Sequence, residues 1–212
     1  KQVRAGYEFK QVLNDAWSLR HNLRYEYQSG HYENMYAKWW DGLLADGRSL
    51  NRILYAGKSR ANIVNTDVQL EGKLNIGATK HTVLFGVDTM RARDDSRTID
   101  DIDATPLDVY TPVYGTFPLP ALVYNPSNPS TTRQTGVFVQ DQIKFNDRWV
   151  ALLGLRHDSV KTSLRDTPNA GVDDSAWSKR LGLVYLADGG WAPYLSYSES
   201  FQAVAGTDKG SG

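Results

Sequence analysis

The sequence contains no cysteine among its 212 residues, so disulfide bridges and cysteine-ligated metal sites are excluded. No run of about 18 apolar residues occurs, which excludes a membrane-spanning helix. Charge of one sign does not dominate, because 24 lysines and arginines stand against 24 aspartates and glutamates. No net field therefore indicates a nucleic acid as partner. Aromatic residues with a polar atom are abundant: twelve tyrosines and six tryptophans favour places where one end is apolar and the other wet.

The two ends of the sequence predict a piece cut from a longer protein. The first residues, KQVRAGYEFK, already alternate as a strand does, and no segment of the kind that forms a signal peptide opens the chain. The last residues, GTDKGSG, have the composition of a loop in which the chain stops.

A pair of long alternating strands lies between Arg133 and Ser159. Apolar side chains fall on one side of each strand and polar side chains on the other, the period of two that marks a strand with one apolar face. Asn146 and Asp147 predict a tight turn, because short Asx side chains bond to nearby backbone and tolerate unusual dihedrals. Asp141 falls on the apolar side and breaks the pattern.

The same hairpin occurs four times, which predicts eight antiparallel strands in an up-and-down meander. The predicted short turns are Asn14-Asp15, Gly77 to Lys80, Asn146-Asp147 and Asp188-Gly189-Gly190. A tryptophan lies just past three of them, at positions 17, 149 and 191. The predicted irregular connections are Ser29 to Ser49, Arg91 to Thr132 and the shorter Arg165 to Ser175.

Alternation is typical of both a soluble sandwich and a transmembrane barrel, and three features favour the barrel. Short turns and long loops alternate strictly, as in outer-membrane barrels. The strands run to roughly 10 to 14 residues, longer than the usual five or six of globular sheets and suited to tilted spanning strands. The tryptophans gather at the short-turn end, where an interfacial aromatic girdle would lie.

The alternation also predicts which side chains face lipid and which face the barrel interior. We expect these residues to point outward: Leu19, Leu23, Val64, Val68, Leu70, Leu153, Leu155, Leu181, Leu183 and Leu195. We expect these to point inward: Arg20, Arg24, Asp67, Glu71, Arg156, Asp158, Arg180 and Ser196.

Several segments resemble a known family. QTGVFVQDQIKF, followed by LLGLRHD and by GLVYLADGGWAPYLSYSESFQAVAGTDKG, closely resembles TonB-dependent siderophore receptors of the ferrichrome and ferrioxamine type. HTVLFGVDTMR and LDVYTPVYG fit the same group, so the resemblance covers nearly the whole chain.

The resemblance implies a function and a place in the cell. Family members are barrels of about 22 strands in the outer membrane of Gram-negative bacteria, closed by an N-terminal plug domain. They carry ferric siderophores inward and are energised by the TonB complex. Residues 1–212 would then be a central part of the barrel domain, without the plug and the remaining strands. The implied partners are a ferric siderophore, with the hydroxamate type as the expected class, the TonB complex through the absent plug domain, and outer-membrane lipid.

The sequence offers no enzyme motif and no resident cofactor, so iron would be present only within the transported chelate. The four histidines, His21, His31, His81 and His157, lack the spacing of a metal site. An acidic stretch, Asp94 to Asp103, is read as a solvated loop rather than a cation site, although it would favour a cationic ligand electrostatically.

Aromatic residues in the two long connections are the candidate ligand-binding site. The candidates are Tyr36, Trp39, Trp40, Tyr110, Tyr114 and Phe117, with Tyr32 and Tyr124 as further members of the aromatic set. Packing of the loops against one another explains the same rings equally well. Two other functions stay open, namely a passive outer-membrane barrel and a soluble β-sandwich binding module.

Overall fold

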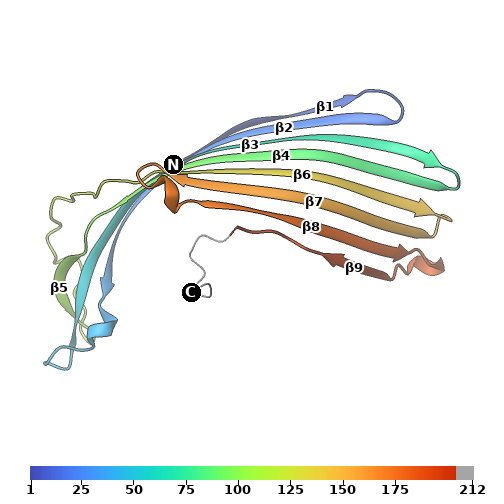
Figure 1. Ribbon diagram of the computed structural model, residues 1–212. Coiled ribbons are helices and arrows are strands. Elements are labelled where there is room, and N and C mark those ends of the chain that lie inside the picture. The colour runs from blue at the N-terminus through green and yellow to red at the C-terminus, as the bar shows by residue number, and fades with distance from the viewer. Residues whose placement is uncertain (204–212) are drawn as a thin grey trace.

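The computed structural model describes residues 1–203, and these form one antiparallel sheet (Figure 1). Its strands are β1 (Gln2–Val12), β2 (Trp17–Ala37), β3 (Ser49–Ile76), β4 (Thr79–Thr98), β5 (Ile102–Asp108), β6 (Ser130–Phe145), β7 (Trp149–Leu164), β8 (Val172–Tyr185) and β9 (Tyr194–Ser198). Three short 3-10 turns complete the set: η1 (Trp39–Asp41), η2 (Pro168–Ala170) and η3 (Asp188–Gly190). Within residues 1–203, no helix has the length and apolar character needed to cross a membrane. The expected loop at Gly206 to Gly212 lies outside the described residues.

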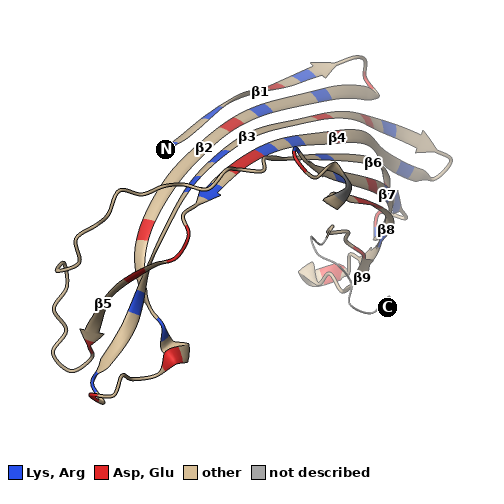
Figure 2. Cartoon of the chain, turned by 60° about the vertical axis from the view of Figure 1, so that its left-hand side comes forward, with Lys and Arg blue, Asp and Glu red and all other residues tan. Residues whose placement is uncertain are grey.

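The sheet follows the chain as a meander, in the order β1-β2-β3-β4-β6-β7-β8-β9. These eight strands are the eight that the alternation predicts. The sheet is strongly curved and open, with β1 and β9 at its two edges (Figure 2). The short turns lie at one end and the long connections at the other (Figure 1), so the predicted alternation of turn lengths is confirmed.

The sheet contains one strand beyond the predicted eight, because β5 pairs with the beginning of β3 outside the main order. The sequence pattern does not indicate β5 because Pro106 interrupts it. Opposite this proline, the ladder with β3 shifts register between Leu50 and Arg52. Proline is tolerated at such bulges and on edge strands. The predicted irregular segments are also too long, because β2 runs to Ala37 and β4 runs to Thr98.

The two faces of the sheet differ in chemistry as predicted. Residues directly opposite in an antiparallel ladder share a face, and Leu19, Leu70, Phe85, Val139 and Leu155 form one such row across five strands. All ten residues expected to point outward share this apolar face, and all eight expected to point inward share the other.

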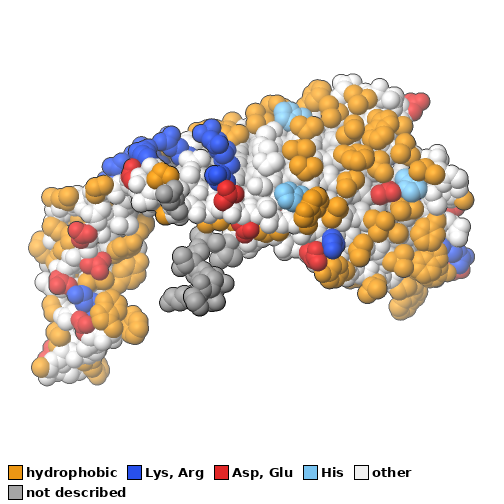
Figure 3. Space-filling view, viewed as in Figure 1, with side chains coloured by type: hydrophobic (Ala, Val, Ile, Leu, Met, Phe, Trp, Pro, Cys, Tyr) orange, Lys and Arg blue, Asp and Glu red, His pale blue; other side chains and the backbone are white. Residues whose placement is uncertain are grey.

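No second sheet covers the apolar face within residues 1–203. Leu153 retains 48% of its surface and Leu195 retains 77%, and the apolar side chains spread broadly over one side of the sheet (Figure 3). A sandwich would bury them between two layers. The sandwich alternative is therefore wrong for the described chain.

Three glycines of the sheet lie directly opposite aromatic residues. Gly57 is paired with Tyr32, Gly72 with Trp17, and Gly86 with Phe138. In each pair the ring lies over the glycine, where a Cβ atom would collide with it. Aromatic rings that cover cross-strand glycines help to pin the register of a sheet.

The turn of the predicted central hairpin has the expected backbone. Asn146 and Asp147 have φ values of 54° and 50°, the left-handed region that Asx residues tolerate better than most. At the first turn, the Asn14 side-chain oxygen accepts hydrogen bonds from the backbone N–H groups of Ala16 and Trp17, at 2.9 and 3.0 Å. Both turns confirm the chemistry predicted for them.

Candidate functional site

The long-loop end of the chain is built on strands that extend past the rest of the sheet. The far ends of β2 and β3 continue as a hairpin, and β5 lies beside it (Figure 1). Lys38 forms an ion pair with Asp103. The buried Arg52 donates from Nε to the Thr105 carbonyl at 2.8 Å. These contacts fix β5 and the segment that follows it to the hairpin.

A small apolar core holds residues 109–129 against the same hairpin. Leu54, Ala56 and Ile99 are buried, and Phe117 and Tyr124 pack against them together with Ile102 and Leu122. Phe117, one of the predicted ligand-binding residues, is therefore a half-buried packing residue. Its side chain stabilises the loop that carries Tyr110 and Tyr114.

The other predicted aromatics are exposed. Trp39 and Trp40 in η1 retain 77% and 57% of their surface, with ring centroids 5.8 Å apart in an edge-to-face arrangement. Tyr110 and Tyr114 are similarly exposed, and the Arg48 guanidinium lies 5.2 Å from the centre of the Tyr110 ring. These four rings offer apolar area to a ligand without any change in the fold.

Tyr36 belongs to a second group of rings. It lies 6.4 Å from Tyr55, which lies 5.6 Å from Tyr32. Tyr55 is not among the predicted site residues, because it lies outside the two long connections, Ser29 to Ser49 and Arg91 to Thr132, that supplied the candidates. The signal for it is the register, since Tyr55 pairs with Asn34 and so stands between the two tyrosines of β2. The structure thus gathers the six predicted residues at one end, but in separate groups.

Asp108 accepts several hydrogen bonds at the long-loop end of the chain. It accepts hydrogen bonds from the backbone N–H groups of Thr111 and Tyr110 at 3.0 and 2.8 Å, and from Arg48 Nε at 3.0 Å. These bonds, the one from Thr111 first, lower the pKa of Asp108 from 3.8 to about 2. The ionised carboxylate therefore holds the start of the 109–129 segment.

The acidic stretch is dispersed along this end. Asp94 and Asp95 lie in β4, Asp103 is paired with Lys38, and Asp100 accepts from Asn125 Nδ2 at 2.8 Å. Residues 1–203 contain no group of three side chains placed to hold a metal ion.

The polar face carries a network centred on Arg156. Its guanidinium reaches Asp88 on β4 at 2.7 and 2.9 Å and Asp158 at 2.7 and 2.6 Å. It crosses β6 at Gly136, where any Cβ atom would collide with it. Phe138 lies beside the same guanidinium, at 5.5 Å from the ring centre. Fixed charges of this kind suit contact with water or with a hydrated protein surface.

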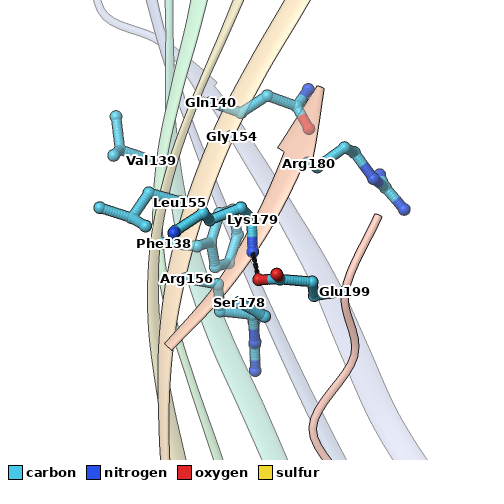
Figure 4. Close-up of a pocket in the computed structure, with 10 residues that line it drawn as sticks. All are labelled: Phe138, Val139, Gln140, Gly154, Leu155, Arg156, Ser178, Lys179, Arg180 and Glu199. Atoms are coloured by element: carbon cyan, nitrogen blue, oxygen red, sulfur yellow. Dashed lines mark hydrogen bonds between the residues drawn. The ribbon is translucent and has the colours of Figure 1, made fainter. Parts of the chain in front are cut away.

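A small hollow lies beside this network (Figure 4). It measures about 250 Å³ and is bordered by Phe138, Gln140, Arg156, Arg180 and Glu199, with the Lys179 backbone N–H donating to Glu199 at 3.1 Å. Sites for bulky ligands occupy about 300–1,000 Å³. The hollow is therefore too small to hold a large chelate.

Histidines on the apolar face have polar neighbours. His81 Nδ1 lies 2.7 Å from Asp141 Oδ2, which explains why Asp141 falls on the apolar side. His21 contacts the Tyr7 hydroxyl at 3.1 Å and Thr66 Oγ1 at 2.9 Å. Each imidazole ring thus forms a hydrogen bond to a side chain of a neighbouring strand.

A curved antiparallel meander with one exposed apolar face, one polar face, short turns at one end and long loops at the other is a segment of an up-and-down β-barrel wall. The model of one protein family, described as TonB dependent receptor-like, beta-barrel, matches residues 1–211. The chain belongs to this family.

Relatives and solved structures agree with this assignment. The chain is 33% identical over 208 residues to the ferrioxamine B receptor of Salmonella typhimurium strain LT2, covering 96% of the chain and 28% of that receptor. It is 35% identical over 222 residues to the ferrichrome outer membrane transporter/phage receptor of Escherichia coli K12, covering 93% of the chain and 29% of the transporter. The crystal structure of BauA, the ferric preacinetobactin receptor from Acinetobacter baumannii, superposes with a TM-score of 0.76 at 18% identity, over 91% of the chain and 29% of BauA. The chain thus spans less than a third of the length of these relatives.

Proposed function

We propose that this chain is part of the barrel of an outer-membrane receptor that carries ferric siderophores, with the hydroxamate type as the expected class. The names of the relatives, a ferrioxamine B receptor and a ferrichrome transporter, support the ligand class. The iron is cargo inside the chelate, and no resident cofactor is part of the proposal. TonB would energise transport through a plug domain that lies elsewhere in the parent protein.

The observation that carries the membrane part of the proposal is the uncovered apolar face. Val68, Phe85, Val137, Leu153 and Leu181 each retain more than a third of their surface on it. A face of this size needs an apolar neighbour, and the acyl chains of an outer membrane are the neighbour that fits a barrel wall. The polar face would then line the interior.

The open edges support a larger barrel. β1 pairs only with β2 and β9 pairs only with β8 within residues 1–203. Barrels leave no strand edge unpaired. The proposal is that further strands of the parent protein pair with both edges and close the wall.

The exposed aromatics at the long-loop end are the proposed ligand contacts. A ferric hydroxamate presents a compact and mostly neutral surface, to which rigid rings offer apolar area at little entropic cost. Trp39, Trp40, Tyr110 and Tyr114 are the proposed contacts, with Tyr36 beside them. Phe117 holds the loop that presents Tyr110 and Tyr114.

The test measures binding of ferrioxamine B to the full-length receptor in neutral detergent, by titration calorimetry, after single alanine substitutions at Trp39, Trp40, Tyr110 and Tyr114. One or two substitutions should weaken binding by about 2 kcal/mol, roughly 30-fold, because a few anchors dominate most interfaces. The matched control is Trp191→Ala, since Trp191 is as exposed as Trp39 but lies at the short-turn end. Unchanged affinity in all four folded variants would refute the proposed contacts.

A second measurement separates the receptor from a passive barrel. Cells that produce the receptor are supplied with radiolabelled ferric ferrioxamine B, with and without a functional TonB. A receptor of this family should accumulate iron only when TonB is present. Equal uptake in both strains would favour the passive pore.

A further inference from the structure

The hairpin formed by the far ends of β2 and β3 carries different groups on its two faces. The ladder between the two strands runs without a register shift, so every second residue of β2 stays on one face. Tyr32 and Tyr36 therefore belong to the polar face, which would line the barrel interior. Leu54 and Ala56, members of the buried cluster that holds residues 109–129, belong to the opposite face. The hairpin thus presents tyrosines on the interior side.

Three tyrosines line the polar face of the hairpin and are called the tyrosine strip below: Tyr32, Tyr36 and Tyr55. Tyr55 lies opposite Asn34, between the two tyrosines of β2, and its ring centroid is 5.6 Å from that of Tyr32 and 6.4 Å from that of Tyr36. The Tyr32 ring covers Gly57, where a Cβ atom would lie 2.5 Å from the ring. Tyr32 and Tyr36 are exposed. The strip therefore offers apolar ring surface to a ligand at the long-loop end.

A polar hollow of about 490 Å³ lies directly beside the tyrosine strip. Two consecutive ladder rows form its floor on the polar face, first Gly30, Ser59 and Ser96, and then Gln28, Ala61 and Asp94. The next row toward the loops contains Tyr32. The hollow falls within the range of about 300–1,000 Å³ that ligand pockets occupy. Unlike the hollow beside Arg156, it is large enough to hold part of a bulky ligand.

Asp94 gives this hollow a negative charge on the polar face. Lys1, Arg60 and Asp95 also border the hollow, but the register places them in a row of the opposite face. Asp95 lies 3.7 Å from Arg97, whereas Asp94 is exposed and forms no ion pair with a residue of the described chain. A carboxylate without a cation of its own, beside hydroxyl and amide groups, favours a ligand that brings a positive charge.

The separation between the rings and the carboxylate fits a chelate with a flexible arm. Tyr32 is directly opposite Gly57, which is directly opposite Thr98, so Asp94 lies four residues along β4 from the row of Tyr32. Four residues span about 14 Å, at about 3.4 Å each. A compact metal–hydroxamate centre on the tyrosine strip can therefore extend an alkyl arm of several methylene groups across the hollow to the carboxylate.

We propose that Asp94 selects ferric hydroxamates that carry a primary ammonium group on a flexible arm, while the tyrosine strip contacts the metal-bearing part of the chelate. The ammonium donates to the Asp94 carboxylate, and the oxygens of Ser59, Ser96 and Gln28 can accept its remaining hydrogens. The inference rests on the siderophore function proposed above and adds a residue that determines specificity within the hydroxamate class.

The test compares ferrioxamine B, whose arm ends in a primary ammonium, with its N-acetyl derivative, which has the same iron-binding groups but no positive charge. Both are titrated by calorimetry into the full-length receptor in neutral detergent. The wild type should bind ferrioxamine B about fivefold more tightly, because an exposed ion pair contributes up to about that factor. D94N should abolish this preference and leave the affinity for the N-acetyl derivative unchanged. High salt should reduce the preference of the wild type.

The matched control is E33Q. Glu33 is exposed and lies on the same hairpin, but the register places it directly opposite Ala56, on the face away from the hollow. E33Q removes one negative charge from the same end of the molecule and should keep the fivefold preference. An equal loss of preference in D94N and E33Q would assign the effect to the general charge of this end and overturn the role of Asp94.

The variant Y55A tests the tyrosine strip. It should weaken the binding of both chelates by the same factor, about tenfold, because both present the same metal-bearing part to the ring. The preference for the ammonium group should remain. Unchanged affinity of Y55A for both chelates would refute the position of the metal centre on the strip.

The pair of chelates also separates this inference from the function on which it rests. If neither chelate binds the wild type, the siderophore function fails, and the inference fails with it. If both bind the wild type equally well at low salt, the siderophore function stands and the inference alone is refuted. This comparison needs no variant, so it decides the inference even if D94N folds poorly.

Discussion

Arg156 on β7 reaches across the bare backbone of β6 to Asp88 on β4, with 2.7 Å between Nη1 and Oδ2. The contact spans two strand intervals and is possible because Gly136 lies between the two residues. It ties three strands together through side chains in addition to their backbone ladder. The first prediction follows from this relationship.

Arg156→Met should lower the free energy of unfolding by about 3 kcal/mol, because it leaves two carboxylates facing each other without a cation, one of them on the buried Asp158. The measurement is guanidinium unfolding of the full-length receptor in detergent. Arg148→Met is the control, since Arg148 pairs with an exposed Asp188 and such pairs contribute about 1 kcal/mol or less. Equal effects of the two substitutions would show that the network adds no more stability than an exposed ion pair.

Asp141→Leu should destabilise the protein by about 1–3 kcal/mol, because His81 then loses its partner on the apolar face. The double variant His81→Leu/Asp141→Leu should unfold close to the wild type, since both polar groups are replaced together. The measurement is a double-mutant cycle of unfolding free energies. Additive effects of the two single substitutions would mean that the pair is not coupled.

Phe117→Ala should loosen residues 109–129 without unfolding the sheet. The half-buried ring packs against the buried cluster of Leu54, Ala56 and Ile99, and its loss should cost the loop about 2 kcal/mol, less than a fully buried phenylalanine. Limited proteolysis of the receptor should then cut this segment faster. Tyr114→Ala serves as the control, because Tyr114 is exposed, and it should leave the cleavage rate unchanged.

The attachment of the same segment should depend on pH through Asp108. The pKa of Asp108 is lower in the folded chain, about 2 against 3.8. The ionised carboxylate therefore stabilises the loop fully at pH values above 3.8, and this stabilisation is lost as the pH falls from about 4 to about 2. The protection of the Tyr110 and Thr111 amides from hydrogen exchange, relative to an unfolded peptide at the same pH, should fall over that range. Asp108→Asn should remove the pH-dependent part of the change, and an unaltered profile in that variant would assign the effect to another group.

The period of two explains why the strands and their faces could be predicted from the sequence. Each of the eighteen side chains assigned to a face lies on the predicted one, because a slip of a single residue would turn a whole apolar set toward the polar side. At Asp141 local alternation fails because a partner strand decides. Asp141 is off the pattern because of His81, which lies 60 positions earlier in the chain.

The loop-bearing end was less predictable because its order depends on contacts between distant segments. β5 contains Pro106 and pairs with β3 through a ladder that shifts register, which no local pattern indicates. The sequence does not distinguish the roles of Phe117 and Tyr114, yet Phe117 packs against the buried cluster and Tyr114 is exposed. Whether the exposed rings bind a chelate stays a prediction.

The three glycines beneath aromatic rings have a consequence for how this sequence can change during descent. A larger residue at position 57, 72 or 86 would displace the ring that covers it, and loss of the ring would uncover a strand position with no side chain to pack. Either change alone is unfavourable, but both together restore an ordinary cross-strand pair. Positions 17 and 72, 32 and 57, and 86 and 138 should therefore vary in pairs among related receptors, each preserving the alignment of two neighbouring strands.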